Sequence, residues 1–114
     1  MQAKRQCEMR VLLDECMPRD FKKYLSAHEC LTAPEAGLAG KKNGELIRAA
    51  AGRFDVMVTV DRKLRYQQNV PRLPFGIVVL KAHGNRLEDL VPLAPATLAA
   101  LQGIKPGLVI EVGA

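Results

Sequence analysis

Two short apolar runs that end abruptly in acidic residues constrain this chain more than any other feature. Residues 10–13 lead directly into Asp14 and Glu15, and residues 56–60 lead directly into Asp61. A short run rich in Val and Leu indicates a strand that is buried on both faces, as in a parallel sheet. Ligands of open parallel sheets bind just beyond the carboxyl ends of the strands. We therefore expect these three acids to lie along one edge of such a sheet.

The rest of the chain alternates predicted strands with predicted helices. This order predicts an α/β fold with a mostly parallel sheet of about five strands. We expect a polar lead-in over residues 1–9 and a single domain over residues 10–114. Further strands are expected at residues 30–32, 76–80 and 108–112, and helices at residues 19–27, 44–51 and 85–101, the last interrupted at Pro92.

Two helices carry local signals that the structure can test. The helix over residues 19–27 is expected to turn Phe21, Tyr24 and Leu25 toward the core. The last helical segment is expected to begin at Asn85, because Asn85 and Glu88 fit a capping box in which Asn replaces Ser or Thr.

Composition limits the classes of function. Hydrophobic residues make up 48% of the chain, without a continuous apolar stretch long enough to span a bilayer. The first residues contain no apolar signal region, so a cytoplasmic protein is expected. Three cysteines without CxxC spacing predict reduced thiols rather than disulfides or zinc. The net charge of +5 suits a polyanionic partner such as nucleic acid, or an acidic protein, although ordinary solubility charge reaches this size.

The acids at the strand ends favour a metal site. Neighbouring carboxylates repel each other unless a cation lies among them, and oxygen ligands suit Mg²⁺ or Mn²⁺. Glu45, expected in the first turn of a helix at the same edge, is either a further ligand or a complement to the helix dipole. The alternative for all these acids is that they only cap helices or form turns. Cys16 is not expected to be a nucleophile, because Asp14 and Glu15 would raise its pKa.

Cations lie close to these acids in the sequence. Lys41 and Lys42 precede Glu45, while Arg62 and Lys63 follow Asp61. A carboxylate centre ringed by cations is the arrangement that cleavage of a phosphodiester chain needs, since the acids hold metal and the cations hold the backbone. The pattern therefore indicates phosphate chemistry.

Several segments together resemble the short PIN-like proteins of the toxin–antitoxin type. The matching segments are residues 11–15, 43–47 and 58–62, supported by residues 66–69 and 85–87. The subgroup that they resemble carries a domain of unknown function and is described as a predicted nuclease. The resemblance covers about residues 10–112, nearly the whole chain.

The resemblance implies a three-layer α/β/α PIN-like sandwich that binds Mg²⁺ or Mn²⁺ and hydrolyses single-stranded RNA. Asp14 matches the acid of the first strand, Asp61 the acid after the third strand, and Glu45 falls on the helical segment that supplies another. This sequence departs from the family at two positions. Asn43 aligns with the usual helical Asp, and Lys63 stands where a further acid often occurs.

Two hypotheses of different classes follow from the resemblance. The first is a Mg²⁺- or Mn²⁺-dependent endoribonuclease, a toxin held in check by a small antitoxin protein, with a homodimer as one possible state. The rival is a non-catalytic PIN-like module that binds RNA or a partner protein, in which Lys63 partly neutralises the acids. On the first hypothesis the catalytic residues are Asp14, Asp61 and Glu45, the metal ligands are Asp14, Glu15, Glu45 and Asp61, and the substrate-binding residues are Lys41, Lys42, Asn43, Arg62 and Lys63.

Overall fold

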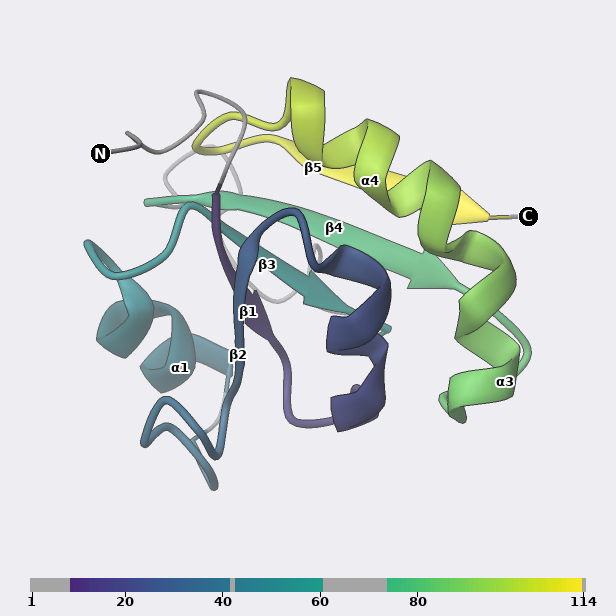
Figure 1. Ribbon diagram of the computed structural model, residues 1–114. Coiled ribbons are helices and arrows are strands. Elements are labelled where there is room, and N and C mark those ends of the chain that lie inside the picture. Colours follow the sequence, from purple (N-terminus) through teal and green to yellow (C-terminus); the bar gives the residue numbers. More distant parts are fainter. Residues whose placement is uncertain (1–8, 42, 61–73, 114) are drawn as a thin grey trace, which may run out of the picture.

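The predicted strands form one sheet with helices between them. The computed structural model describes residues 9–41, 43–60 and 74–113, with the backbone alone for residues 43 and 44. Figure 1 shows the elements along the chain and labels the strands and the α-helices. They are β1 (Arg10–Leu13), η1 (Arg19–Leu25), β2 (Glu29–Thr32), α1 (Asn43–Ala50), β3 (Val56–Thr59), β4 (Gly76–Lys81), α3 (Leu87–Leu90), η3 (Val91–Leu93), α4 (Ala94–Gly103) and β5 (Val109–Gly113), where η denotes a 3₁₀ helix.

The five strands lie in the order β2-β1-β3-β4-β5, and every neighbouring pair is parallel. The predicted α/β fold with a parallel sheet of about five strands is therefore confirmed. The chain first passes from β1 outward to β2, then crosses back over β1 to β3. The direction of winding thus reverses between β1 and β3, and this reversal is where doubly wound sheets bind their ligands, beyond the carboxyl ends of the strands.

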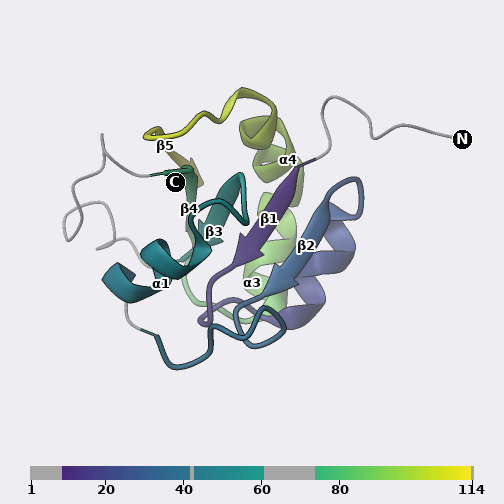
Figure 2. The same cartoon turned by 90° about the vertical axis from the view of Figure 1, so that its left-hand side faces the viewer.

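Separate hydrophobic cores cover the two faces of the sheet. Leu13 and Val58 belong to one core, which includes side chains from η1, α3 and α4. Leu12 and Met57 belong to the other core, which α1 completes. Figure 2 shows α1 on one side of the strands and η1, α3 and α4 on the other. Helices on both faces are consistent with the expected sandwich and explain why the three central strands, β1, β3 and β4, are mostly apolar and buried.

The first helix differs from its prediction in type and length. It is a 3₁₀ helix over Arg19–Leu25, which begins with an N–H···O bond of 3.1 Å from Phe21 to Pro18. Phe21 and Leu25 are fully buried as predicted, whereas Tyr24 is 40% exposed. The prediction for Tyr24 is therefore corrected. Its ring packs beside that of Phe21, with centroids 6.1 Å apart, while an amphipathic Tyr can keep its hydroxyl in water.

The last helical segment begins one residue later than predicted. Arg86, not Asn85, is the N-cap of α3, and its backbone N–H donates to Oδ2 of Asp89 at 3.2 Å. Pro92 lies in the short η3, and Pro95 lies in the first turn of α4, so the predicted interruption is confirmed. Among the described residues, no helix is both long and apolar enough to cross a membrane.

Candidate functional site at the carboxyl edge of the sheet

Asp14 follows the last residue of β1 and is nearly buried, with 8% of its surface exposed. Its backbone N–H donates to the carbonyl oxygen of Val58 at 3.0 Å, so the residue continues the pairing of β1 with β3 beyond the end of the strand. Leu12 and Met57 point toward the α1 core, and the alternation of side chains along a strand places Asp14 and Thr59 on that same face. The two strands therefore bring these two polar side chains together.

The carboxylate of Asp14 is held by neighbours on both oxygens. The hydroxyl of Thr59, which is fully buried, donates to Oδ2 at 2.7 Å. The backbone N–H of Glu15 donates to Oδ1 at 2.8 Å. Hydrogen bonds to a carboxylate are the stronger kind and fix its orientation. Since a carboxylate offers about four acceptor positions, these bonds leave room for a further ligand.

Cys16 lies against the same pair. Its Sγ is 3.5 Å from Oδ2 of Asp14 and 3.5 Å from Oγ1 of Thr59. Burial raises the pKa of the Cys16 thiol above its usual 9.0, and the charge of Asp14 adds to the rise against the opposing hydrogen bond with Thr59. The predicted direction is confirmed, with burial as the larger cause. A thiol that stays protonated is a poor nucleophile, so Cys16 is a packing neighbour of Asp14.

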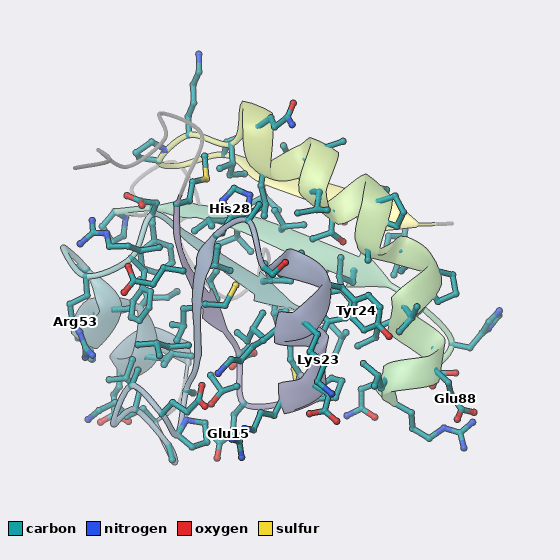
Figure 3. All side chains as sticks on the ribbon, viewed as in Figure 1. Glu15, Lys23, Tyr24, His28, Arg53 and Glu88 are labelled. Atoms are coloured by element: carbon teal, nitrogen blue, oxygen red, sulfur yellow. The ribbon has the colours of Figure 1, made fainter. Side chains whose placement is uncertain are left out.

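Two further loops meet the turn that follows Asp14. The backbone N–H of Gly40, which has a φ of +82°, donates to Oε1 of Glu15 at 3.1 Å. The side-chain amide of Asn85 donates to the carbonyl oxygen of Cys16 at 3.2 Å. Loops that follow β2 and β4 therefore converge on the loop that follows β1, and Figure 3 shows Glu15 there, far from His28 at the opposite end of β2.

The structure places the other predicted residues as follows. Glu15 and Lys41 are exposed on the two loops that meet, and Glu45 is exposed in the first turn of α1, which Asn43 begins. No group of three or more His, Cys, Asp or Glu residues that could hold a metal gathers within the described ranges. Lys42, Asp61, Arg62 and Lys63 lie outside the described residues, so their predicted roles stay predictions.

Thr59 and Asn85 are the site residues that the sequence did not reveal. Thr59 is one of five residues in an apolar run, where a Thr ordinarily indicates only a strand. The alternation of side chains along a strand could have indicated it. Thr59 stands two residues after Met57 and therefore faces the same side of the sheet as Met57 and Asp14. Asn85 resembled a helix cap, and its side chain instead bridges two loops.

Comparison of the chain with models of protein families, with curated proteins and with solved structures gives no match. No relative therefore supplies a residue role, and the chemistry of this edge rests on its own geometry.

Proposed function

We propose that the carboxyl edge around Asp14 is the centre of a Mg²⁺- or Mn²⁺-dependent endoribonuclease. The observation that carries the proposal is a nearly buried carboxylate at the reversal of the sheet, with no Lys or Arg ion pair among the described residues. Buried carboxylates are ordinarily paired with cations or bound to metals. Asp61, which follows β3 by two positions, is the second acid expected at this edge.

The residues fit a small, hard cation. Mg²⁺ is usually bound through one or two carboxylates together with waters and substrate phosphates, so Asp14 and Asp61 are a sufficient protein contribution. Thr59 would orient Asp14 from behind, as partners of metal ligands do. Glu15 and Glu45 would assist directly or through water. Bound there, the ion would supply activation of water and stabilisation of charge on the phosphodiester.

The substrate would be single-stranded RNA. Lys41, Lys42, Arg62 and Lys63 surround the acids in the sequence and would meet backbone phosphates, with Asn43 as a further polar contact. In keeping with the resemblance, we propose that the protein is the toxin of a toxin–antitoxin pair in the cytoplasm. A small antitoxin protein would be its partner, and a homodimer is compatible with this role.

Replacement of Asp14 by Asn tests the metal site. The substitution keeps the shape and an oxygen that can accept from Thr59, and it removes the charge that attracts the cation. We expect Mn²⁺ affinity, measured by calorimetry, and cleavage of a single-stranded RNA to fall at least about hundredfold, because loss of a ligand costs at least as much as loss of an outer partner. Asp61→Asn should behave in the same way.

Glu29→Gln is the control, since Glu29 is an exposed acid at the start of β2, on the opposite edge. It should leave both measurements unchanged. Cleavage by folded Asp14→Asn at the wild-type rate would overturn the assignment.

The rival function is a non-catalytic module that binds RNA or a protein, and Lys63 in place of a family acid is the feature that favours it. It predicts RNA binding without Mn²⁺ binding in the folded wild type. The same calorimetric titration therefore separates the two functions.

A further inference from the structure

A concave site lies at the carboxyl end of β4. A cavity of about 380 Å³ separates the end of β4 from α3 and η3, and its lining includes Lys81, His83, Asp89 and Leu93. Small-molecule sites commonly measure ~300–1,000 Å³. The cavity is therefore large enough for one small ring system and stands at the lower end of that range.

The loop that follows β4 both lines the cavity and contacts the turn after Asp14. Asn85 stands two residues after His83 in the loop that follows β4, and its side chain donates to the carbonyl oxygen of Cys16 at 3.2 Å. Cys16 in turn contacts Asp14. A strand of RNA that reached Asp14 could thus place a neighbouring base in the cavity.

The lining combines apolar surface, a ring and an acceptor. Pro92 and Leu93 supply apolar contact, and the exposed imidazole of His83 can stack on a flat ligand. Asp89 is mostly shielded, with 20% of its side chain exposed. Its Oδ2 accepts from the backbone N–H of Arg86, whereas Oδ1 accepts no hydrogen bond within the part of the chain that the structure describes.

The charges around the cavity largely offset one another. Lys81 lies 3.7 Å from Glu111, and Arg86 lies 3.3 Å from Glu88 and 3.5 Å from Asp89. Glu88, labelled on α3 in Figure 3, also lines the cavity. The cavity therefore offers hydrogen-bond acceptors without a large excess of negative charge. A large excess of negative charge would repel the phosphates of an RNA substrate.

We propose that this cavity binds a guanine base of single-stranded RNA next to the cleaved phosphodiester, an inference that rests on the proposed function. Guanine presents two adjacent N–H donors on its Watson–Crick edge, and one carboxylate can accept both. Uracil places carbonyl oxygens on both sides of its single donor, and these would face the Asp89 carboxylate unfavourably. Cytosine and adenine offer an amino donor beside a ring nitrogen that accepts. Asp89 thereby determines the choice of base.

Binding of free nucleosides tests the cavity without metal or cleavage. Guanosine, adenosine, cytidine and uridine would be titrated into the full chain and followed by NMR. We expect guanosine to bind about tenfold more tightly than uridine, and Asp89→Asn to weaken guanosine binding about tenfold. Asn keeps an oxygen that can accept from Arg86, so α3 should persist. Asp20→Asn makes the same chemical change on an exposed side chain of η1, which does not line the cavity, and it should have little effect.

His83→Ala provides a second variant on an exposed residue, and it should weaken all four nucleosides by loss of stacking. Equal affinity for the four nucleosides, or equal effects of Asp89→Asn and Asp20→Asn, would overturn the proposal. If Asp89→Asn fails to fold, the affinities of the wild type and of His83→Ala for the four nucleosides still test the proposal.

Cleavage of a mixed-sequence RNA with Mn²⁺ gives the second arm. Cuts at a fixed position relative to guanine, lost in Asp89→Asn, are expected. Cleavage without base preference would overturn this inference and leave the proposed nuclease standing. Guanosine binding without any cleavage would overturn the proposed nuclease, and with it the placement of guanine beside a cleaved phosphodiester, and would leave only a guanine-binding cavity. Guanosine binding together with cleavage that ignores guanine would assign the cavity to a free nucleoside and would overturn its assignment to RNA.

Discussion

Asp14 and Thr59 are separated by many residues in the chain, yet their side chains share a hydrogen bond of 2.7 Å. Parallel pairing of β1 with β3 aligns Leu13 with Val58, so the next residue of each strand stands at the same level and on the same face. The contact is thus a consequence of register rather than of a local motif. Burial of both residues then makes each dependent on the other, because a buried carboxylate without partners is costly.

Thr59→Val should weaken the metal site while it leaves Asp14 in place. Val has nearly the shape of Thr and lacks the hydroxyl that orients the carboxylate. We expect Mn²⁺ affinity to fall about 10–100-fold, as for other losses of a ligand's partner. Stability should fall by about 1–3 kcal/mol, because Asp14 loses a buried donor. Calorimetry and chemical denaturation measure the two effects separately.

Thr97→Val is the matched control for this prediction. Thr97 of α4 is also fully buried, and its hydroxyl donates to the carbonyl oxygen of Leu93, the last residue of η3, at 2.8 Å. It should lower stability without a change in Mn²⁺ affinity, and Thr59→Ser should retain most of that affinity. Unchanged Mn²⁺ binding by Thr59→Val would show that Thr59 only supports packing.

The sequence indicated the acid of this site and missed its partners, for a physical reason. Asp14 interrupts an apolar run, which makes it conspicuous. Thr59 is an ordinary strand residue, and only the register of β1 against β3 distinguishes it from other Thr residues. Asn85 has a local role that the sequence suggests, a helix cap, and a distant role that depends on how two loops meet. Contacts set by register or loop approach are not local properties of a sequence.

Among the elements, β1, β3 and β4 were predicted best, because buried parallel strands are uniformly apolar and flanked by breakers. The helix ends were predicted less well. Capping of α3 depends on Asp89 reaching back to the N–H of Arg86, three residues earlier. Asn is a preferred N-cap and Arg is not, so the sequence favours Asn85, whose side chain instead donates to the carbonyl oxygen of Cys16.

Glu35 links η1 to the turn that follows β2. Its carboxylate accepts from Nζ of Lys22 at 2.8 and 2.9 Å and from the backbone N–H of Thr32 at 3.0 Å. Nε of Arg19 lies 3.6 Å away. The hydrogen bond with Lys22, followed by that with Thr32, lowers the pKa of Glu35 from its usual 4.5 to about 2.

The stability that Glu35 contributes should therefore depend on pH. A carboxyl whose pKa is lowered by folding stabilises the folded state while it is ionised, so the contribution is complete above pH 4.5 and declines as the pH falls toward 2. We expect Glu35→Gln to melt at a lower temperature than the wild type at pH 7, with a difference that shrinks between pH 4.5 and pH 2.

Thermal unfolding at a series of pH values measures this difference. Glu88→Gln, in which an exposed acid of α3 loses its charge, is the control and should show a smaller difference at pH 7. A Glu35→Gln difference that is constant down to pH 2 would contradict the assigned pKa.

At the scale of the whole molecule, the two edges of the sheet differ in what they carry. The carboxyl edge holds Asp14 and the loop with Lys41. Lys105 lies at the opposite edge, in the loop before β5. In that loop the backbone N–H of Gly107 donates at 3.2 Å to the carbonyl oxygen of Phe75, the residue just before β4. If RNA binds at the carboxyl edge, removal of a cation from that edge should weaken RNA binding more than removal of a cation from the other edge. Each cation contributes equally to the net charge of +5.

The salt dependence of RNA binding tests this asymmetry. Each phosphate contact with single-stranded nucleic acid adds about −0.7 to the slope of log K against log salt, since it releases condensed counterions. Four cations, Lys41, Lys42, Arg62 and Lys63, should give a slope of about −3, measured on Asp14→Asn so that the proposed cleavage does not consume the RNA. Lys41→Ala should make the slope shallower by about 0.7, and Lys105→Ala should leave it unchanged. Fluorescence anisotropy over a salt series measures all three. Equal changes of the slope for Lys41→Ala and Lys105→Ala would mean that RNA binding depends only on the total charge of the protein. The carboxyl edge would then not be the RNA-binding site.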